Sequence, residues 1–155
     1  MNAKTPPDFA DLMLETFRLN GRLLAAGDAL VADIGLTSAR WQVLGAIALS
    51  PQPLPVAHIA RNMGLTRQAV QRVANEMARD GLVRFADNPH HRRAKLVLHT
   101  KKGRAAYDAV MRRYDPWAAA LAAGLGSGQI GAALSVLRTV RQRLEAAAAG
   151  GDDDA

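Results

Sequence analysis

Residues 56–104 hold the most informative pattern of the chain: VAHIARNMGLTRQAVQRVANEMARDGLVRFADNPHHRRAKLVLHTKKGR. The stretch begins with a short apolar helix pattern that ends at Gly64, and a second helix pattern opens at Thr66. Two short runs rich in apolar and β-branched residues follow, at 82–86 and 94–100, with a basic turn segment between them. This order of elements predicts a helix-turn-helix followed by a β-hairpin wing.

The second helix of this pair has one apolar face and one polar face. Its apolar residues recur at the spacing of a helix side that faces a core: Val70, Val73, Ala74 and Met77. The opposite face suits DNA, because Arg pairs with guanine and Gln or Asn pairs with adenine. We therefore predict DNA contacts from Thr66, Arg67, Gln68, Gln71, Arg72 and Asn75. An ordinary solvated helix face is the alternative interpretation. Leu65, in the turn, is expected to fill the corner between the two helices.

The tip of the predicted hairpin is basic. It carries His90, His91, Arg92 and Arg93, and Lys95 follows shortly after. A guanidinium at a wing tip suits a narrow minor groove, where the negative potential is enhanced. We therefore predict that Arg92, Arg93 and Lys95 contact the minor groove or phosphates. The alternative is a solvated loop that bears spare charge.

The positive charge of the chain is concentrated in the same region. Residues 56–104 hold eleven Lys or Arg against three acids, a net charge of +8, whereas the whole chain has +6. The remaining residues therefore sum to −2. This distribution is expected of a surface that faces phosphates, although a merely solvated basic surface has the same composition.

The rest of the chain is helical in pattern. A long helix runs from Phe9 to about Gly35, a second covers roughly 38–50, and the proline-rich stretch Ser50–Pro55 is expected to be a loop. The chain is helical again from Lys101, with a kink expected at Pro116. A break at 124–128 precedes the last helix.

The terminal helices suggest a dimer. Their apolar stripes are too long to be buried on one small lobe, so two copies are expected to cover them across a twofold axis. The alternative is a monomer whose stripes pack internally. The expected parts are a first dimerisation helix at 8–36, a DNA lobe at 37–100, further dimerisation helices at 101–148 and a disordered tail at 149–155.

Several other classes of protein fit the sequence poorly. There is no cysteine, which excludes disulfides and cysteine-ligated zinc, and the adjacent His90 and His91 do not have the spacing of a metal site. We find no nucleophile elbow and no paired catalytic carboxylates, so we expect no enzyme, no metal and no cofactor. The sequence contains no signal peptide pattern and no apolar run of membrane-spanning length, which predicts a cytoplasmic protein.

These features together resemble the MarR (multiple antibiotic resistance regulator) family of winged-helix transcription factors. The resemblance is most specific in LTSARWQVLGAI (36–47), in the helix-turn-helix at 59–83 and in the wing at 88–103. It implies a mainly α fold with a small β-hairpin wing, in which both chain ends build a helical dimerisation region. It also implies, in many members, a pocket for a small-molecule effector.

Two positions depart from the family pattern. The family wing commonly carries Asp-x-Arg, in which the acid orients the arginine, but here His91 precedes Arg93. This wing is therefore expected to be looser or to be oriented by Asp87. In the segment that usually reads Leu-Thr-x-x-Gly, His99 takes the place of the leucine, which is expected to alter packing where the wing meets the next helix.

The resemblance also suggests where an effector would bind. Trp41 and His58 are candidate lining residues, and Arg40 is a candidate anchor for an anion. A tryptophan on an apolar helix is more often simply part of the core.

The sequence thus favours a homodimeric regulator of palindromic or pseudo-palindromic DNA sites, and the family resemblance implies a repressor released by a small molecule. The alternative is an architectural or partner-binding winged-helix protein with little sequence preference, which would bind DNA mainly through phosphates.

Overall fold

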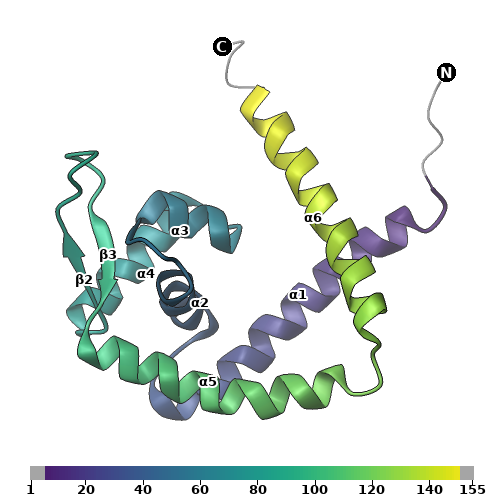
Figure 1. Cartoon of the computed structure of the whole chain (residues 1–155), viewed down its shortest axis with the longest axis horizontal. Helices are drawn as coiled ribbons and strands as arrows, with labels where there is room; N and C mark the ends of the chain where they lie inside the picture. The colour runs from purple at the N-terminus through teal and green to yellow at the C-terminus, as the bar shows by residue number, and fades with distance from the viewer. Residues whose placement is uncertain (1–5, 151–155) are drawn as a thin grey trace. The chain divides into compact units, whose positions relative to one another are not determined.

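The structure, a computed structural model, describes residues 6–150 (Figure 1). Its elements in chain order are α1 (Phe9–Val31), the 3-10 turn η1 (Ala32–Ile34), α2 (Ser38–Ala48), β1 (Leu54–Pro55), α3 (Val56–Met63), α4 (Arg67–Arg79), β2 (Val83–Ala86), β3 (Leu96–His99), α5 (Lys101–Ala122) and α6 (Ser127–Gly150). The predicted class, mainly α with a small β-hairpin wing, is confirmed. The chain divides into two compact units, Met1–Asp115 and Pro116–Ala155.

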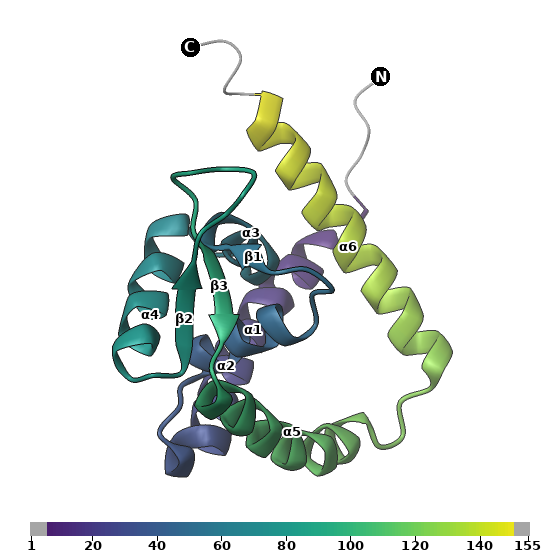
Figure 2. The same cartoon turned by 60° about the vertical axis from the view of Figure 1, so that its left-hand side comes forward.

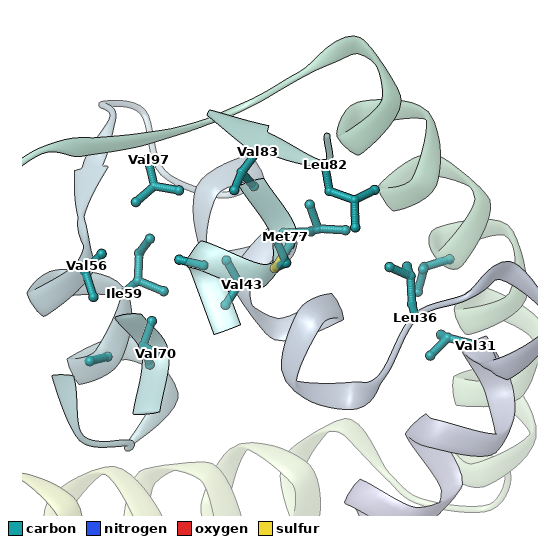
Figure 3. Close-up of a cluster of buried hydrophobic side chains, with 14 residues drawn as sticks. Val31, Leu36, Val43, Val56, Ile59, Val70, Met77, Leu82, Val83 and Val97 are labelled. Carbon is teal, nitrogen blue, oxygen red and sulfur yellow. The ribbon is translucent and has the colours of Figure 1, made fainter. Parts of the chain in front are cut away.

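The first unit is built around α2. This helix packs against α1, α3, α4 and β3, and the side chains between them form the hydrophobic core in Figure 3. Val43 and Leu44 of α2, Ile59 of α3, Met77 of α4 and Val97 of β3 are all fully buried. Burying each such side chain contributes about 1.5–3 kcal/mol, so this core holds the helix-turn-helix and the sheet together.

The junction of α1 and α2 is close because two small residues meet there. Ser38 is buried, its backbone N–H donates to Asp28 Oδ1 at 2.6 Å, and its hydroxyl donates to the Leu24 carbonyl at 2.8 Å. A Cβ on Gly27 would lie 2.5 Å from Ser38 Oγ. Glycine at 27 is therefore what permits the two helices to approach this closely.

The sheet has three strands in the order β1-β3-β2, all antiparallel. Figure 2 shows β2 and β3 beside α4, with the loop between the two strands extending past the sheet. The expectation that all of Ser50–Pro55 is a loop was wrong at its end, because Leu54 pairs with Val97 and Pro55 with Leu96. β1 is an edge strand, where a proline without an N–H is tolerated.

A tight joint connects the sheet to α5. The Thr100 N–H and hydroxyl both donate to the Leu82 carbonyl, at 3.2 and 3.1 Å, and the hydroxyl also lies 2.6 Å from the Gly81 carbonyl. Gly103 lies in the first turn of α5, against the backbone of Leu82, and a Cβ there would overlap the Leu82 carbonyl. This contact accounts physically for the glycine of the Thr-x-x-Gly segment.

The break between the two C-terminal helices lies where the sequence predicts it. At Pro116, where a kink was expected, α5 is assigned as one continuous helix that ends at Ala122, and Gly124 after it has a φ of +80°. α6 begins at Ser127, so Ser127 lies in the first turn, and the Gly126 N–H before it donates to the Gln129 side chain at 2.9 Å. α6 extends to Gly150, and residues 151–155 of the predicted tail lie outside the described residues. Within residues 6–150 no single helix is long and apolar enough to cross a membrane, whereas α5 and α6 taken as a bent pair pass the same test by length and composition.

Candidate nucleic-acid interface

The turn between α3 and α4 has the geometry that the sequence predicts. Gly64 ends α3 with a φ of +64°, in the left-handed region that favours glycine. Thr66 caps α4, because its hydroxyl accepts from the Ala69 N–H at 3.2 Å. The expectation for Leu65 was wrong: 45% of this residue is exposed, so it does not fill the corner between the helices. Only the backbone N–H of Leu65 is used there, donating to the Ala60 carbonyl at 3.0 Å.

The two faces of α4 are separated as predicted. Val70, Ala74 and Met77 are fully buried, and Val73 is partly buried against the core. Thr66, Arg67, Gln68, Arg72 and Asn75 are exposed, and Gln71 is half-buried. Gln71 Nε2 donates to Asn75 Oδ1 at 2.9 Å, one helical turn along the same face. The exposed face therefore presents ordered amides beside two guanidinium groups.

The C-terminal end of α4 is held by basic residues from two other helices. Arg40 of α2 pairs with Asp80 at 2.8 Å and with Glu76 at 3.8 Å, and its own side chain is mostly buried. Lys102 of α5 donates to the Asp80 carbonyl at 2.7 Å. Cations are favourable at this end of a helix, so these contacts help to fix the orientation of α4. The Arg40 guanidinium is thus engaged with α4.

The wing is ordered by Asn88. Its side-chain oxygen accepts from the His90 N–H at 3.0 Å, and its carbonyl accepts from the His91 N–H at 3.2 Å. Asp87 lies 3.7 Å from Lys95, so the acid that was expected to orient Arg93 pairs with the lysine instead. Among the described residues, neither Arg92 nor Arg93 has an acidic partner within ion-pair distance, and both are exposed.

A groove of about 860 Å³ lies between α4, the start of α3 and the wing. It brings together five of the predicted DNA contacts from separate parts of the sequence: Arg67, Gln71, Asn75, Arg93 and Lys95. The other four, Thr66, Gln68, Arg72 and Arg92, are exposed but do not line it. Three histidines also line it, His58, His90 and His91. The sequence placed His90 and His91 at the tip of the wing, but it predicted no DNA contact from any of the three.

The three candidate effector residues do not share a site. His58 lies in the groove just described, Arg40 is paired with α4, and Trp41 packs on Tyr114 edge to face with ring centroids 5.6 Å apart. A second hollow of about 540 Å³, between α2 and α3, is lined by none of the three. Trp41 also packs against the core, which is the commoner role of a buried tryptophan.

His99 joins the wing to two helices. Its Nε2 lies 2.9 Å from the Leu44 carbonyl of α2, and its ring lies 6.1 Å from that of Tyr107 in α5. Desolvation by burial lowers the pKa of His99 from its ordinary value, and Arg104 acts in the same direction; the Leu44 hydrogen bond and Asp108 oppose the shift. The histidine at this position therefore replaces the family's leucine with a polar link between sheet and helix.

A helix-turn-helix with an exposed reading helix, followed by a basic antiparallel hairpin, defines the class of winged helix-turn-helix proteins. A family model described as MarR family matches residues 34–94. The chain belongs to the MarR family; it is a transcription regulator, as the sequence predicted, and not an enzyme.

Relatives of known sequence agree with this assignment. An uncharacterized protein of Mycobacterium tuberculosis is 40% identical over 106 residues, which cover 68% of this chain and 73% of that protein. The transcriptional activatory protein BadR of Rhodopseudomonas palustris is 30% identical over 99 residues, or 63% of this chain and 57% of BadR.

Solved structures are similar over most of the chain. The transcriptional regulator MosR of Mycobacterium tuberculosis, solved in complex with DNA, is 27% identical with a TM-score of 0.72 and coverage of 87% of this chain and 96% of that one. CouR from Rhodococcus jostii, solved with p-coumaroyl-CoA, is 23% identical with a TM-score of 0.76 and coverage of 84% and 92%. The likeness to CouR concerns the fold.

Proposed function

We propose that this MarR-family regulator binds pseudo-palindromic DNA sites as a homodimer, with α4 in the major groove and the wing on the flanking minor groove or backbone. The observation that carries the proposal is the groove of about 860 Å³, in which amides of α4 face cations of the wing. Of the described residues, those that line it include no Asp or Glu. A concave surface with positive charge and base-reading amides suits duplex DNA.

The residues on α4 have distinct proposed roles. Arg67 and Gln71 lie on the early turns of the helix, where base contacts concentrate in helix-turn-helix proteins. Asn75 accepts a hydrogen bond from Gln71, so it orients the Gln71 amide as well as facing the groove. Thr66, Gln68 and Arg72 are exposed beside these residues and are proposed to contact adjacent bases or phosphates.

The residues on the wing are proposed to hold the flanking DNA. Arg93 lines the groove and has no acidic partner among the described residues, so its full charge is available to a phosphate or to the minor groove. Arg92 is proposed to act beside it. Lys95 pairs with Asp87 at 3.7 Å, so we expect it to contribute less to DNA affinity than Arg93 does.

The exposed apolar side chains of α1 and α6 support the homodimer. α1 exposes Leu14, Phe17, Leu19 and Leu23, and 70% of Phe17 is accessible. α6 exposes Ile130, Leu134, Val136, Leu137 and Leu144. Rows of this kind mark an interface, and a twofold dimer would set two α4 helices about 34 Å apart, one turn of DNA. In this proposal 8–36 and 101–148 form the dimerisation region and 37–100 the DNA lobe.

The direction of regulation has two candidates. The first is a repressor that a small-molecule effector releases, as the family resemblance implies. The second is an activator, which BadR favours because it is named an activatory protein and is 30% identical. Either role requires the protein to act where the DNA is, so we propose a cytoplasmic location.

The test is selection of DNA sites from a randomised duplex pool, combined with light scattering to measure the mass of the free and bound protein. We expect a pseudo-palindrome with half-sites about one helical turn apart and a mass of two chains. Arg93→Ala tests the wing in the same assay and is expected to weaken binding. Arg84→Ala is its matched control, because Arg84 is also an exposed arginine of the DNA lobe but does not line the groove.

An architectural protein would give a different result. It would enrich no sequence, and its affinity would fall steeply with salt for every duplex alike. That outcome would refute sequence-specific regulation while leaving DNA binding in place.

A further inference from the structure

Three of the four histidines of the chain line one groove. His58 comes from the first turn of α3, whereas His90 and His91 come from the loop between β2 and β3. All three residues are exposed. The fourth, His99, lies at the far end of β3, half-buried and bonded to the Leu44 carbonyl. The fold therefore gathers onto the DNA-facing groove residues that the sequence keeps apart.

The other charged groups that line this groove are all positive. They are Arg67 from α4 and Arg93 and Lys95 from the wing. Asp87, which pairs with Lys95, is not a lining residue. Among the described residues, the groove thus holds no carboxylate. A DNA phosphate bound there would be an anion beside the histidines, and an opposite charge nearby favours a charged imidazole.

Hydrogen bonds hold the backbone of the turn that carries two of these histidines. The His90 and His91 N–H groups donate to Asn88, and the His91 carbonyl accepts from the Ala94 N–H at 3.1 Å. The turn is therefore closed on both sides of the histidine pair. A charged imidazole donates from both ring nitrogens, whereas a neutral one donates from only one, so the charged form is the better partner for phosphate oxygens.

We infer that His58, His90 and His91 bind DNA phosphates in their protonated form, so that DNA binding takes up protons. This inference rests on the proposed use of the groove for DNA. Histidine is the side chain that changes charge between about pH 5 and 8. Because the bound state holds more protons than the free state, affinity rises as the pH falls through this range.

The expected size of the effect follows from exposed ion pairs. Each contributes little, about two- to threefold in affinity, so three together give about a tenfold gain between about pH 8 and about pH 6. Each added phosphate contact also steepens the dependence of log affinity on log salt by about 0.9. We therefore expect the slope at the lower pH to be steeper by roughly 1 to 3.

The experiment measures affinity by fluorescence anisotropy with the full chain and a labelled duplex of mixed sequence, at both pH values and several salt concentrations. Phosphate contacts do not depend on sequence, so this probe is sufficient. The variant carrying His58→Gln, His90→Gln and His91→Gln is expected to lose most of the gain at low pH. His99→Gln, the same change outside the groove, is expected to keep the wild-type ratio.

Calorimetry of the wild-type protein gives a second reading that needs no variant. Titrations in two buffers of different ionisation enthalpy report the protons taken up per chain, and we expect about one to three. If the triple variant does not fold, the three single variants and this proton count carry the test.

Two results would overturn the inference, and they are distinguishable. Measurable binding with equal affinity, equal salt slope and no proton uptake across the pH range would refute the role of the histidines and leave the DNA-binding proposal intact. No binding to any duplex at either pH would refute both the role of the histidines and the DNA-binding proposal.

Discussion

Gly103→Ala is expected to destabilise the joint between the sheet and α5. A Cβ at this position would overlap the Leu82 carbonyl oxygen and lie 2.9 Å from the carbonyl carbon. Both atoms belong to backbone, so no side-chain rotation relieves the overlap. The same oxygen accepts from the Thr100 N–H and hydroxyl, and moving α5 away from it strains both hydrogen bonds.

The magnitude combines three effects. Forcing an extra carbon into a packed site costs about 1–3 kcal/mol, and weakening two hydrogen bonds costs about 1 kcal/mol each. Alanine is favoured over glycine within a helix by about 1 kcal/mol, which offsets part of the loss. We therefore expect the free energy of unfolding to fall by about 2–4 kcal/mol.

Urea denaturation followed by circular dichroism at one fixed protein concentration measures this change, since the stability of an oligomer depends on concentration. Gly45→Ala is the matched control: it lies in α2 of the same unit, and its Cβ would meet only Tyr107 at an ordinary 3.7 Å. We expect this variant to be as stable as the parent or slightly more so. If the two alanine variants had equal stability, the reasoning from close backbone approach would be refuted.

Three further predictions concern the wing, the joint and the helix α1. Arg93→Ala should weaken DNA binding by about 1–3 kcal/mol, and unchanged affinity in anisotropy titrations would remove Arg93 from the interface. The pKa of His99 is lowered by burial, so the unfolded chain binds more protons below about pH 6.5. Stability is therefore complete above that pH and falls as the pH drops through it, and His99→Gln should flatten the stability profile over this window in denaturation experiments. Phe17→Glu places a charge on the exposed apolar row of α1 and should shift the mass in light scattering toward one chain; an unchanged dimer would place the interface elsewhere.

Much of the helix-turn-helix could be predicted because the sequence features that define it are local. Gly64 ends a helix through its own φ, and Thr66 caps the next through a bond to a residue three positions on. The spacing of Val70, Ala74 and Met77 identified the buried face of α4. Each of these signals lies within one or two turns of chain, so the sequence alone reveals it.

Other features were not predicted because the partners are distant in the sequence. The ion pairs of Arg40 with Asp80 and Glu76 join α2 to α4, and no local pattern around Arg40 indicates them. Leu65 has the character of a core residue, yet the core is complete without it and leaves it 45% exposed. The pairing of Leu54 with Val97 was hidden because two residues beside a proline carry no strand pattern of their own.

The class of this protein could be predicted from the sequence, because helix period, cap residues and charge distribution are properties of short segments. The contacts between distant segments are seen only in the folded chain: His58 lines one groove with the wing, Arg40 pairs with α4, and Gly103 lies against the Leu82 carbonyl. The physical reason is that local elements are selected by interactions within a few residues, whereas a groove or a joint depends on how the core brings those elements together.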